Sequence, residues 1–214
     1  MKKTDISRLI INHFKAYLKP YGFKYYSNKF RGKGFEKKTD FGFQQISFGF
    51  LDYAPVFYCN PQASIRFDDV QDIYNQITPM ADWARPFTNT LSVPFKLICN
   101  DSNLLSDRGY KIENEAHLTQ AVESLEEIIQ NNVFSWFLNF NELKKLNETI
   151  NIDIESPINM FISEDERIFK GLIISNLINK TTLPGIVNSY RLKCEAILRA
   201  KDVSKFEDLV IILK

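Results

Sequence analysis

The chain has two histidines, His13 and His117, which are the first residues to test for catalysis or metal binding. A histidine metal site or a pair of histidine catalysts needs several imidazoles close together. His13 stands beside Lys15 in one amphipathic stretch, and His117 stands far along the chain at the start of another. We therefore expect two structural histidines, and the sequence predicts no catalytic residue and no metal site.

Cys59, Cys99 and Cys194 would be nucleophiles only if a neighbouring group lowered their pKa. Cys59 and Cys99 stand in apolar, strand-like stretches, and Cys194 stands on the apolar side of a predicted helix. Such positions are typical of core packing. An odd number of widely spaced cysteines also predicts reduced thiols in a cytoplasmic protein. No pattern in the sequence indicates a cofactor.

Asp68, Asp69 and Asp72 form a carboxylate cluster that could hold a cation. A calcium loop would also need a glycine and a later glutamate, which do not follow at the required spacing. Carboxylates are favourable in the first turn of a helix, where the helix dipole is positive. The cluster therefore predicts a helix capped by Asp68. The segment Ser163-Glu164-Asp165-Glu166 is explained in the same way, as a capping box.

The segment Arg31-Gly32-Lys33-Gly34 resembles part of a phosphate-binding loop. Such a loop needs backbone N–H groups that converge at a helix N-terminus, usually followed by Gly-Lys-Ser/Thr. Here the next elements are predicted strands, so a basic hairpin turn is favoured.

Basic and aromatic residues alternate along this predicted hairpin, residues 23–38. The basic ones are the candidate partner-binding residues Lys24, Lys29, Arg31, Lys33, Lys37 and Lys38. The aromatic ones are Phe23, Tyr25, Tyr26, Phe30 and Phe35. Lysine and aromatic residues together can bind single-stranded nucleic acid, with charge on phosphate and ring on base. They are also typical of an edge strand with one buried face, which is the interpretation we favour.

The elements that must position these residues predict an α+β fold. Apolar residues at helical spacing predict a helix at residues 5–19, ended by Pro20. Alternation with a period of two then predicts strands at 23–30, 34–38, 41–51, 56–67 and 91–99. Short connections favour an antiparallel sheet of four to five strands.

The second half of the chain is expected to be mostly helical. Helices are predicted at 115–130 and 133–149, after Ser163, from Pro184 and after Asp202. Residues 100–114 are polar and rich in turn formers, which suggests a boundary. We therefore expect a sheet module at residues 1–112 and a helical region at 113–214, packed together as one unit.

Charge is unevenly distributed, although the whole chain has a net charge of +1. Residues 1–38 hold eleven Lys and Arg but two Asp and Glu, whereas residues 113–166 hold twelve acidic and two basic residues. Either segment could attract a partner of opposite charge. No stretch approaches the roughly 20 apolar residues that cross a bilayer. We expect a cytoplasmic protein that does not enter a membrane, and the many Lys, Asn and Ile residues are compatible with a bacterial gene.

One resemblance concerns the first part of the chain. The turn Leu18-Lys19-Pro20-Tyr21-Gly22-Phe23-Lys24, followed by Phe30 and by Phe43-Gln44-Gln45-Ile46, resembles a family of uncharacterised bacterial domains. In that family an N-terminal helix leads through a Pro-x-Gly-Phe turn into an antiparallel sheet. The resemblance implies a small α+β module over roughly the first 100 residues. Some relatives look like toxin-immunity or accessory proteins, and the resemblance implies no catalytic residues.

Three function classes stay open from the sequence. The preferred hypothesis is a non-enzymatic protein-binding module of an immunity or accessory type. The first alternative is a nucleic-acid-binding protein that uses the basic hairpin at 23–38. The second alternative is a small-molecule enzyme with carboxylates in an aromatic pocket.

Overall fold

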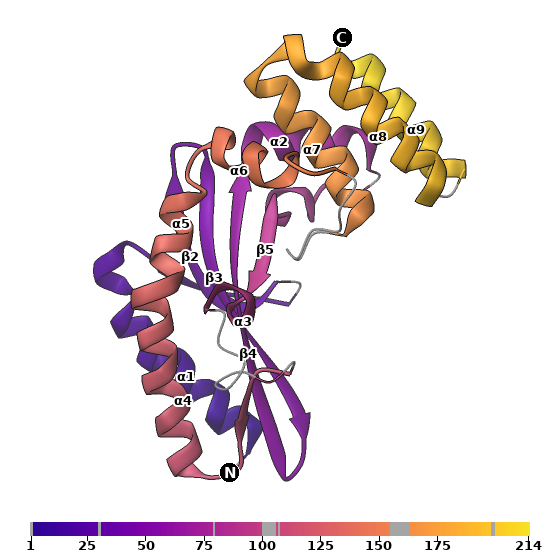
Figure 1. The fold of residues 1–214 in the computed structure, drawn as a ribbon. Coiled ribbons are helices and arrows are strands. Elements are labelled where there is room, and N and C mark those ends of the chain that lie inside the picture. The colour runs from indigo at the N-terminus through magenta and orange to yellow at the C-terminus, as the bar shows by residue number, and fades with distance from the viewer. Residues whose placement is uncertain are drawn as a thin grey trace. The chain divides into compact units, whose positions relative to one another are not determined.

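The computed structural model in Figure 1 describes residues 2–29, 31–78, 80–99, 106, 108–154, 163–197 and 200–214, with the side chains of 197, 200 and 201 excepted. It consists of an N-terminal helix, an antiparallel sheet and a mostly helical C-terminal half. The predicted α+β fold class is therefore confirmed.

The described residues form a six-stranded sheet. Its first five strands lie in chain order: β1 (Lys24–Asn28), β2 (Gly32–Thr39), β3 (Gly42–Tyr53), β4 (Val56–Phe67) and β5 (Leu91–Pro94). β6 (Tyr110–Ile112) pairs with the start of β4. The first four strands agree with the sequence prediction, because alternating residues and short turns mark them clearly. β6 exceeds the predicted strand number, and its three residues are too few to show a period.

The strand expected at residues 91–99 ends early. β5 stops at Pro94, and residues Phe95–Cys99 form a short helix, α3. Proline has no backbone N–H to donate to a strand ladder, and its fixed φ suits a helix start. The prediction of strand beyond Pro94 is therefore wrong.

The chain divides into two compact units, each made of two stretches. The first contains Met1–Ile65 and Ser92–Leu138, and the second contains Arg66–Leu91 and Asn139–Lys214. The boundary that the sequence suggested, between residues 112 and 113, falls inside the first unit. Residues 100–105 and 107 of the polar stretch around it lie outside the described residues.

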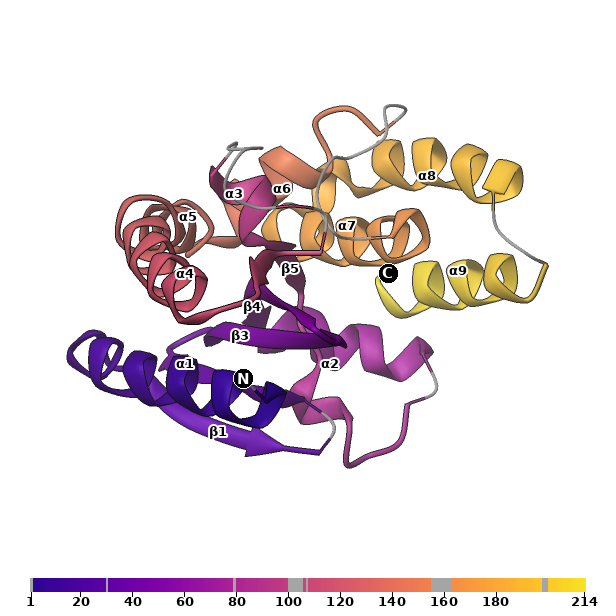
Figure 2. The ribbon, with the colours of Figure 1, turned by 90° about the horizontal axis from the view of Figure 1, so that it is seen from below.

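In the first unit, α1 (Lys3–Tyr17) covers one face of the sheet (Figure 2). Phe14 stacks on Phe48 of β3, with 5.1 Å between ring centroids, and Phe35 of β2 meets the same ring edge-on. α4 (Glu115–Ile128) runs beside α1 and continues through a π-helical turn into α5 (Phe134–Asn139). His13 of α1 lies 2.7 Å from a carboxylate oxygen of Glu126 in α4, which places this histidine in a helix–helix contact.

The second unit is built around one helix, α7 (Glu164–Ile178). Every residue from Arg167 to Asn176 is buried, so this helix is covered on all sides. The helices of this unit that surround it are α2 (Asp68–Ile77), α6 (Leu143–Ile150), α8 (Leu183–Ile197) and α9 (Ala200–Ile212). Figure 2 shows α7, α8 and α9 side by side. The capping interaction predicted at Ser163 is present, since its hydroxyl accepts a hydrogen bond from the N–H of Glu166.

Candidate functional site

The basic residues predicted to bind a partner lie on and around the β1–β2 hairpin. Lys24 stands opposite Glu36 in the ladder, and Lys38 follows Glu36 by two residues, so these three side chains share one face. Lys33 and Lys37 alternate with them and lie on the opposite face. The structure therefore divides these lysines between two faces of the sheet and does not gather them into one patch.

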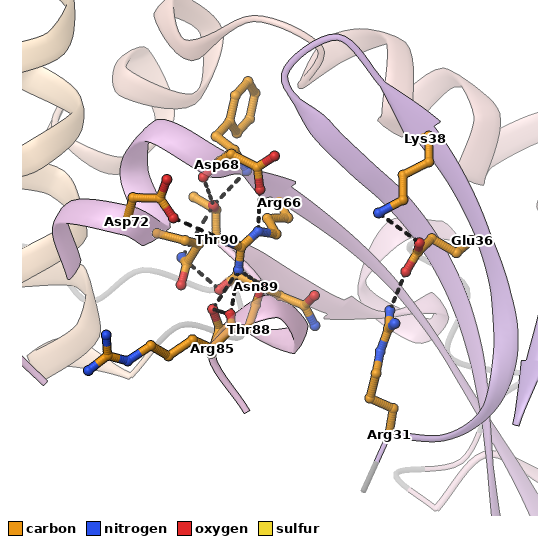
Figure 3. A network of polar contacts seen from close by, with 12 residues as sticks. Arg31, Glu36, Lys38, Arg66, Asp68, Asp72, Arg85, Thr88, Asn89 and Thr90 are labelled. Atoms are coloured by element: carbon orange, nitrogen blue, oxygen red, sulfur yellow. Dashed lines mark hydrogen bonds and ion pairs between the residues drawn. The ribbon is translucent and has the colours of Figure 1, made fainter. Parts of the chain in front are cut away.

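Arg31 is folded back over the hairpin. One of its guanidinium nitrogens lies 2.7 Å from Glu36 Oε2 and 2.9 Å from Gln45 Oε1. Its central carbon lies 4.3 Å from the centre of the Tyr26 ring. Lys38 Nζ lies 3.2 Å from the other carboxylate oxygen of Glu36 (Figure 3). The side chain of Arg31 is 11% exposed, and these contacts hold it against the sheet.

The remaining hairpin residues differ in how far they are buried or bonded within the fold. Lys33 Nζ donates to the hydroxyl of Ser7 in α1 at 3.3 Å, whereas Lys24 and Lys29 are exposed. Phe35 is buried, and Phe30 lies outside the described residues. The favoured interpretation, a strand pair with one buried face, agrees with these contacts. Partner binding by the basic residues stays a prediction.

The aspartate cluster has a different role from the predicted helix cap. α2 begins at Asp68 itself, its N-cap residue is Phe67, and no side chain caps it. Asp68 instead accepts a hydrogen bond from Arg66 Nε, and Asp72 Oδ1 lies 3.5 Å from Arg66 Nη2. The prediction that Asp68 caps the helix is therefore wrong, because the chain supplies a cation of its own to these carboxylates.

Arg66 also binds the loop that returns towards β5. Its Nη1 donates to the carbonyl oxygens of Arg85 and Thr88, at 2.8 Å and 3.1 Å, and to the Thr88 hydroxyl at 2.8 Å (Figure 3). The Arg66 side chain is 6% exposed. A guanidinium has five N–H donors in a fixed plane, so one buried arginine can bind the carboxylates and the loop together.

Lys170 and Gln71 hold the next residues of the same loop. Lys170 Nζ of α7 donates to the carbonyl oxygen of Asn89 at 2.9 Å, and Gln71 Nε2 of α2 donates to it at 3.1 Å. Thr90 Oγ1 accepts from the N–H of Phe67 at 2.9 Å. Burial lowers the pKa of Lys170, which is 3% exposed, against the opposing effect of the Glu166 carboxylate 3.4 Å away. We call residues 80–90 the anchored loop.

The outer side of the anchored loop carries large, accessible side chains. Trp83 is 53% exposed, and Arg85 extends away from the Arg66 cluster in Figure 3. Arg85 Nε lies 3.4 Å from the carboxylate of Asp82 at the surface. The loop thus combines main-chain carbonyls bound from beneath with an exposed aromatic ring and an exposed guanidinium.

Sequence reasoning missed Arg66 and Lys170. Arg66 follows Ser64 and Ile65 in the strand, and nothing in the residue types there sets it apart. Its acceptors come from a loop about 20 residues later, so no local pattern indicates them. Lys170 did leave a signal, since it is a lone cation within the apolar run of α7. A helix that is apolar on all sides is a buried helix, so any lysine inside that run must find a buried partner.

Two of the cysteines are buried thiols with raised pKa values. Burial raises the pKa of Cys59, and it raises that of Cys194 to about 12, which is the opposite of what a thiolate nucleophile requires. Among the described residues, no three His, Cys, Asp or Glu side chains are placed to hold a metal ion. No helix in the described part of the chain is long and apolar enough to span a membrane.

No family model, curated protein or solved structure matches this chain. The resemblance of its first residues to uncharacterised bacterial domains therefore stays a prediction.

Proposed function

We propose that this chain is a non-enzymatic protein-binding module that contacts its partner through the anchored loop. The observation that carries the proposal is that the main chain of this loop is held by buried donors while its large side chains are exposed. Arg66, Gln71 and Lys170 bind the loop from within the second unit, while Trp83 and Arg85 are exposed. Trp and Arg are the residue types enriched among the strongest contributors to protein interfaces.

The buried donors favour binding because they reduce the entropy that a loop loses when a partner docks. A free loop of this length must be ordered on binding, at about 1 kcal/mol or more for each residue fixed. Here three carbonyl oxygens already have buried partners, so much of that ordering occurs during folding. Loops positioned by a rigid scaffold commonly carry the binding residues of a protein.

Burying Lys170 is unfavourable for stability taken alone. A charged amine loses its hydration on burial, and apolar residues of similar volume are often at least as stabilising. A lysine that binds the loop carbonyl therefore contributes mainly to the conformation of the loop. We extend the proposal to an immunity or accessory role in a bacterial cytoplasm, which is supported by the resemblance of residues 18–46.

The proposal is tested by capture from an extract of the native host. The immobilised wild-type chain is compared with Trp83→Ala and with the control Leu138→Ala, which removes an exposed side chain from α5 of the other unit. We expect wild type and the control to retain a stoichiometric protein that Trp83→Ala releases. Equal retention by all three chains, or no retained protein, contradicts the proposal.

A further inference from the structure

The buried Arg66 guanidinium has carboxylates on one side and the anchored loop on the other. It binds Asp68 and Asp72 of α2. On its other side it donates to the carbonyl oxygens of Arg85 and Thr88. Figure 3 shows the two carboxylates across the guanidinium from the loop. Because one guanidinium binds all four groups, the two carboxylates lie directly beside the loop main chain.

Lys170 repeats this arrangement on α7. Its Nζ lies 2.9 Å from the carbonyl oxygen of Asn89 and 3.4 Å from Oε1 of Glu166. Both cations are buried, but the carboxylates that they bind are accessible: the side chains of Asp68, Asp72 and Glu166 are 56%, 72% and 39% exposed. A molecule that approaches the loop therefore meets the carboxylates and not the cations.

Accessible charge around the anchored loop is mostly negative. Residues 66–91 contain two arginines and four aspartates, namely Asp68, Asp69, Asp72 and Asp82. All four aspartates are exposed, and the side chain of Asp82, in the loop itself, is 94% exposed. Arg66 is buried, so Arg85 is the one accessible cation among the described residues of this segment.

Trp83 favours the same kind of ligand as these carboxylates. The face of an indole ring carries negative potential, and it attracts an ammonium or guanidinium group more strongly than a tyrosine or phenylalanine ring does. Trp83 is accessible and directly follows the exposed Asp82. An aromatic ring and a carboxylate that are neighbours in the chain thus both favour a cationic side chain.

We propose that the protein that binds the anchored loop presents a basic surface, with lysine or arginine side chains around the contact of Trp83. The inference rests on the proposed function, in which the loop is the contact, and the carboxylates decide only the charge of the partner. Carboxylates accept hydrogen bonds and donate none, so lysine and arginine are the matching side chains. Charges at the rim of an interface also speed the approach of a partner of opposite charge.

The test measures how fast the protein captured from the host extract associates with the chain at different salt concentrations. For the wild-type chain, the association rate constant should fall about tenfold between about 50 mM and about 500 mM NaCl, because salt screens the attraction between exposed charges. The variant Asp69→Lys/Asp82→Lys should associate about tenfold more slowly at low salt, with a smaller change in the dissociation rate constant.

The matched control is Glu123→Lys/Glu127→Lys, which makes the same change in net charge at two exposed positions of α4 in the first unit. It should associate at nearly the wild-type rate. If circular dichroism shows that the aspartate reversal misfolds, Asp69→Asn/Asp82→Asn replaces it and should show a smaller decrease. An association rate that does not depend on salt overturns the inference, and so does a rate that removing the two aspartate charges leaves unchanged or raises.

Trp83→Ala distinguishes a failure of this inference from a failure of the proposed function. A partner of any charge that binds the anchored loop should be released by Trp83→Ala. If Trp83→Ala releases the partner but the aspartate charges have no effect on its association, the inference is overturned and the proposed function stands. If Trp83→Ala retains the partner, the proposed function is contradicted and the inference fails with it.

Discussion

The two units use cations in opposite ways. In the first unit, the lysines of the β1–β2 hairpin lie at the surface, and strand alternation divides them between two faces. In the second unit, Arg66 and Lys170 are buried, and their donors converge on the carbonyl oxygens of one loop. The comparison teaches that a dense basic stretch need not converge on one surface, whereas two isolated buried cations can hold one loop.

Arg31 shows that the distinction follows geometry and not position in the sequence. It belongs to the basic hairpin, yet it binds Glu36 and Gln45 and stacks on Tyr26, as a buried arginine does. A guanidinium can bind several acceptors in one plane, and a lysine ammonium cannot. The same difference explains why Arg66 binds both the carboxylates of α2 and the anchored loop.

The largest expected effect comes from Arg66→Ala. It leaves the carbonyl oxygens of Arg85 and Thr88 without their buried donor and removes the cation beside Asp68. Since two buried carbonyl oxygens lose a donor, we expect the free energy of unfolding to fall by about 2–4 kcal/mol. Urea denaturation measures it, with Arg85→Ala as the matched control, because that side chain is at the surface and its loss should cost no more than about 1 kcal/mol. Equal losses for both variants contradict the anchoring role.

Lys170→Met tests the second buried cation that binds the anchored loop. Gln71 still donates to the Asn89 carbonyl, so we expect the free energy of unfolding at pH 7 to change by no more than about 1 kcal/mol. The local effect should be larger: amide hydrogen exchange in the anchored loop should become faster than in wild type. Unchanged exchange there would mean that Lys170 does not hold the loop.

The pH dependence of stability gives Lys170 a second test. Its pKa in the folded chain lies below the usual 10.5, so the unfolded chain binds more protons between the two values. Stability due to this residue therefore rises with pH across that window. Lys170→Met should lose that rise as the pH approaches 10.5 from below. Parallel pH profiles for the two chains would contradict a lowered pKa.

Tyr26→Phe tests the buried tyrosine hydroxyl of the β1–β2 hairpin. Burial raises the pKa of Tyr26 to about 12, from its usual value of 10. The folded chain therefore holds this proton longer than the unfolded chain does, and stability from Tyr26 is lost as pH rises from 10 to 12. Tyr26→Phe removes the hydroxyl that pairs with Gln45, which should lower the free energy of unfolding by about 1 kcal/mol near neutral pH. The same substitution should make the loss of stability between pH 10 and about pH 12 smaller than in wild type. Spectrophotometric alkaline titration of both chains measures the difference.

The smallest expected effect concerns the lysines. If the hairpin is a structural strand pair, the wild-type chain should not change the mobility of single-stranded DNA or RNA in low salt. Substituting Lys33, Lys37 and Lys38 by Glu should then change nothing in that assay. Retardation by wild type that the substitutions abolish would instead favour the nucleic-acid hypothesis, with the salt dependence that phosphate contacts produce.

The sheet was largely predictable from sequence because its signals are local. Alternating residues and the turns at Gly32 and Pro55 locate β1 to β4, whereas three-residue β6 and five-residue α3 are too short to show a period. The hairpin lysines were also evident, but whether each is exposed or paired depends on the register of its strand.

The anchored loop was not predictable for a different reason. Its donors come from β4, α2 and α7, and its acceptors are backbone carbonyls, which leave no trace in residue type. Asp68 illustrates the limit: its place at the start of a helix was correctly predicted, but its partner is Arg66 and not the helix N-terminus.

The most direct test of the account compares the two regions within one complex. Hydroxyl-radical footprinting of the chain, alone and with the protein captured from the host extract, reports how accessible Trp83 and the hairpin residue Tyr25 are. The account predicts that the partner slows oxidation of Trp83 and leaves that of Tyr25 unchanged. Protection of Tyr25 with no protection of Trp83 would contradict it and place the partner on the basic hairpin.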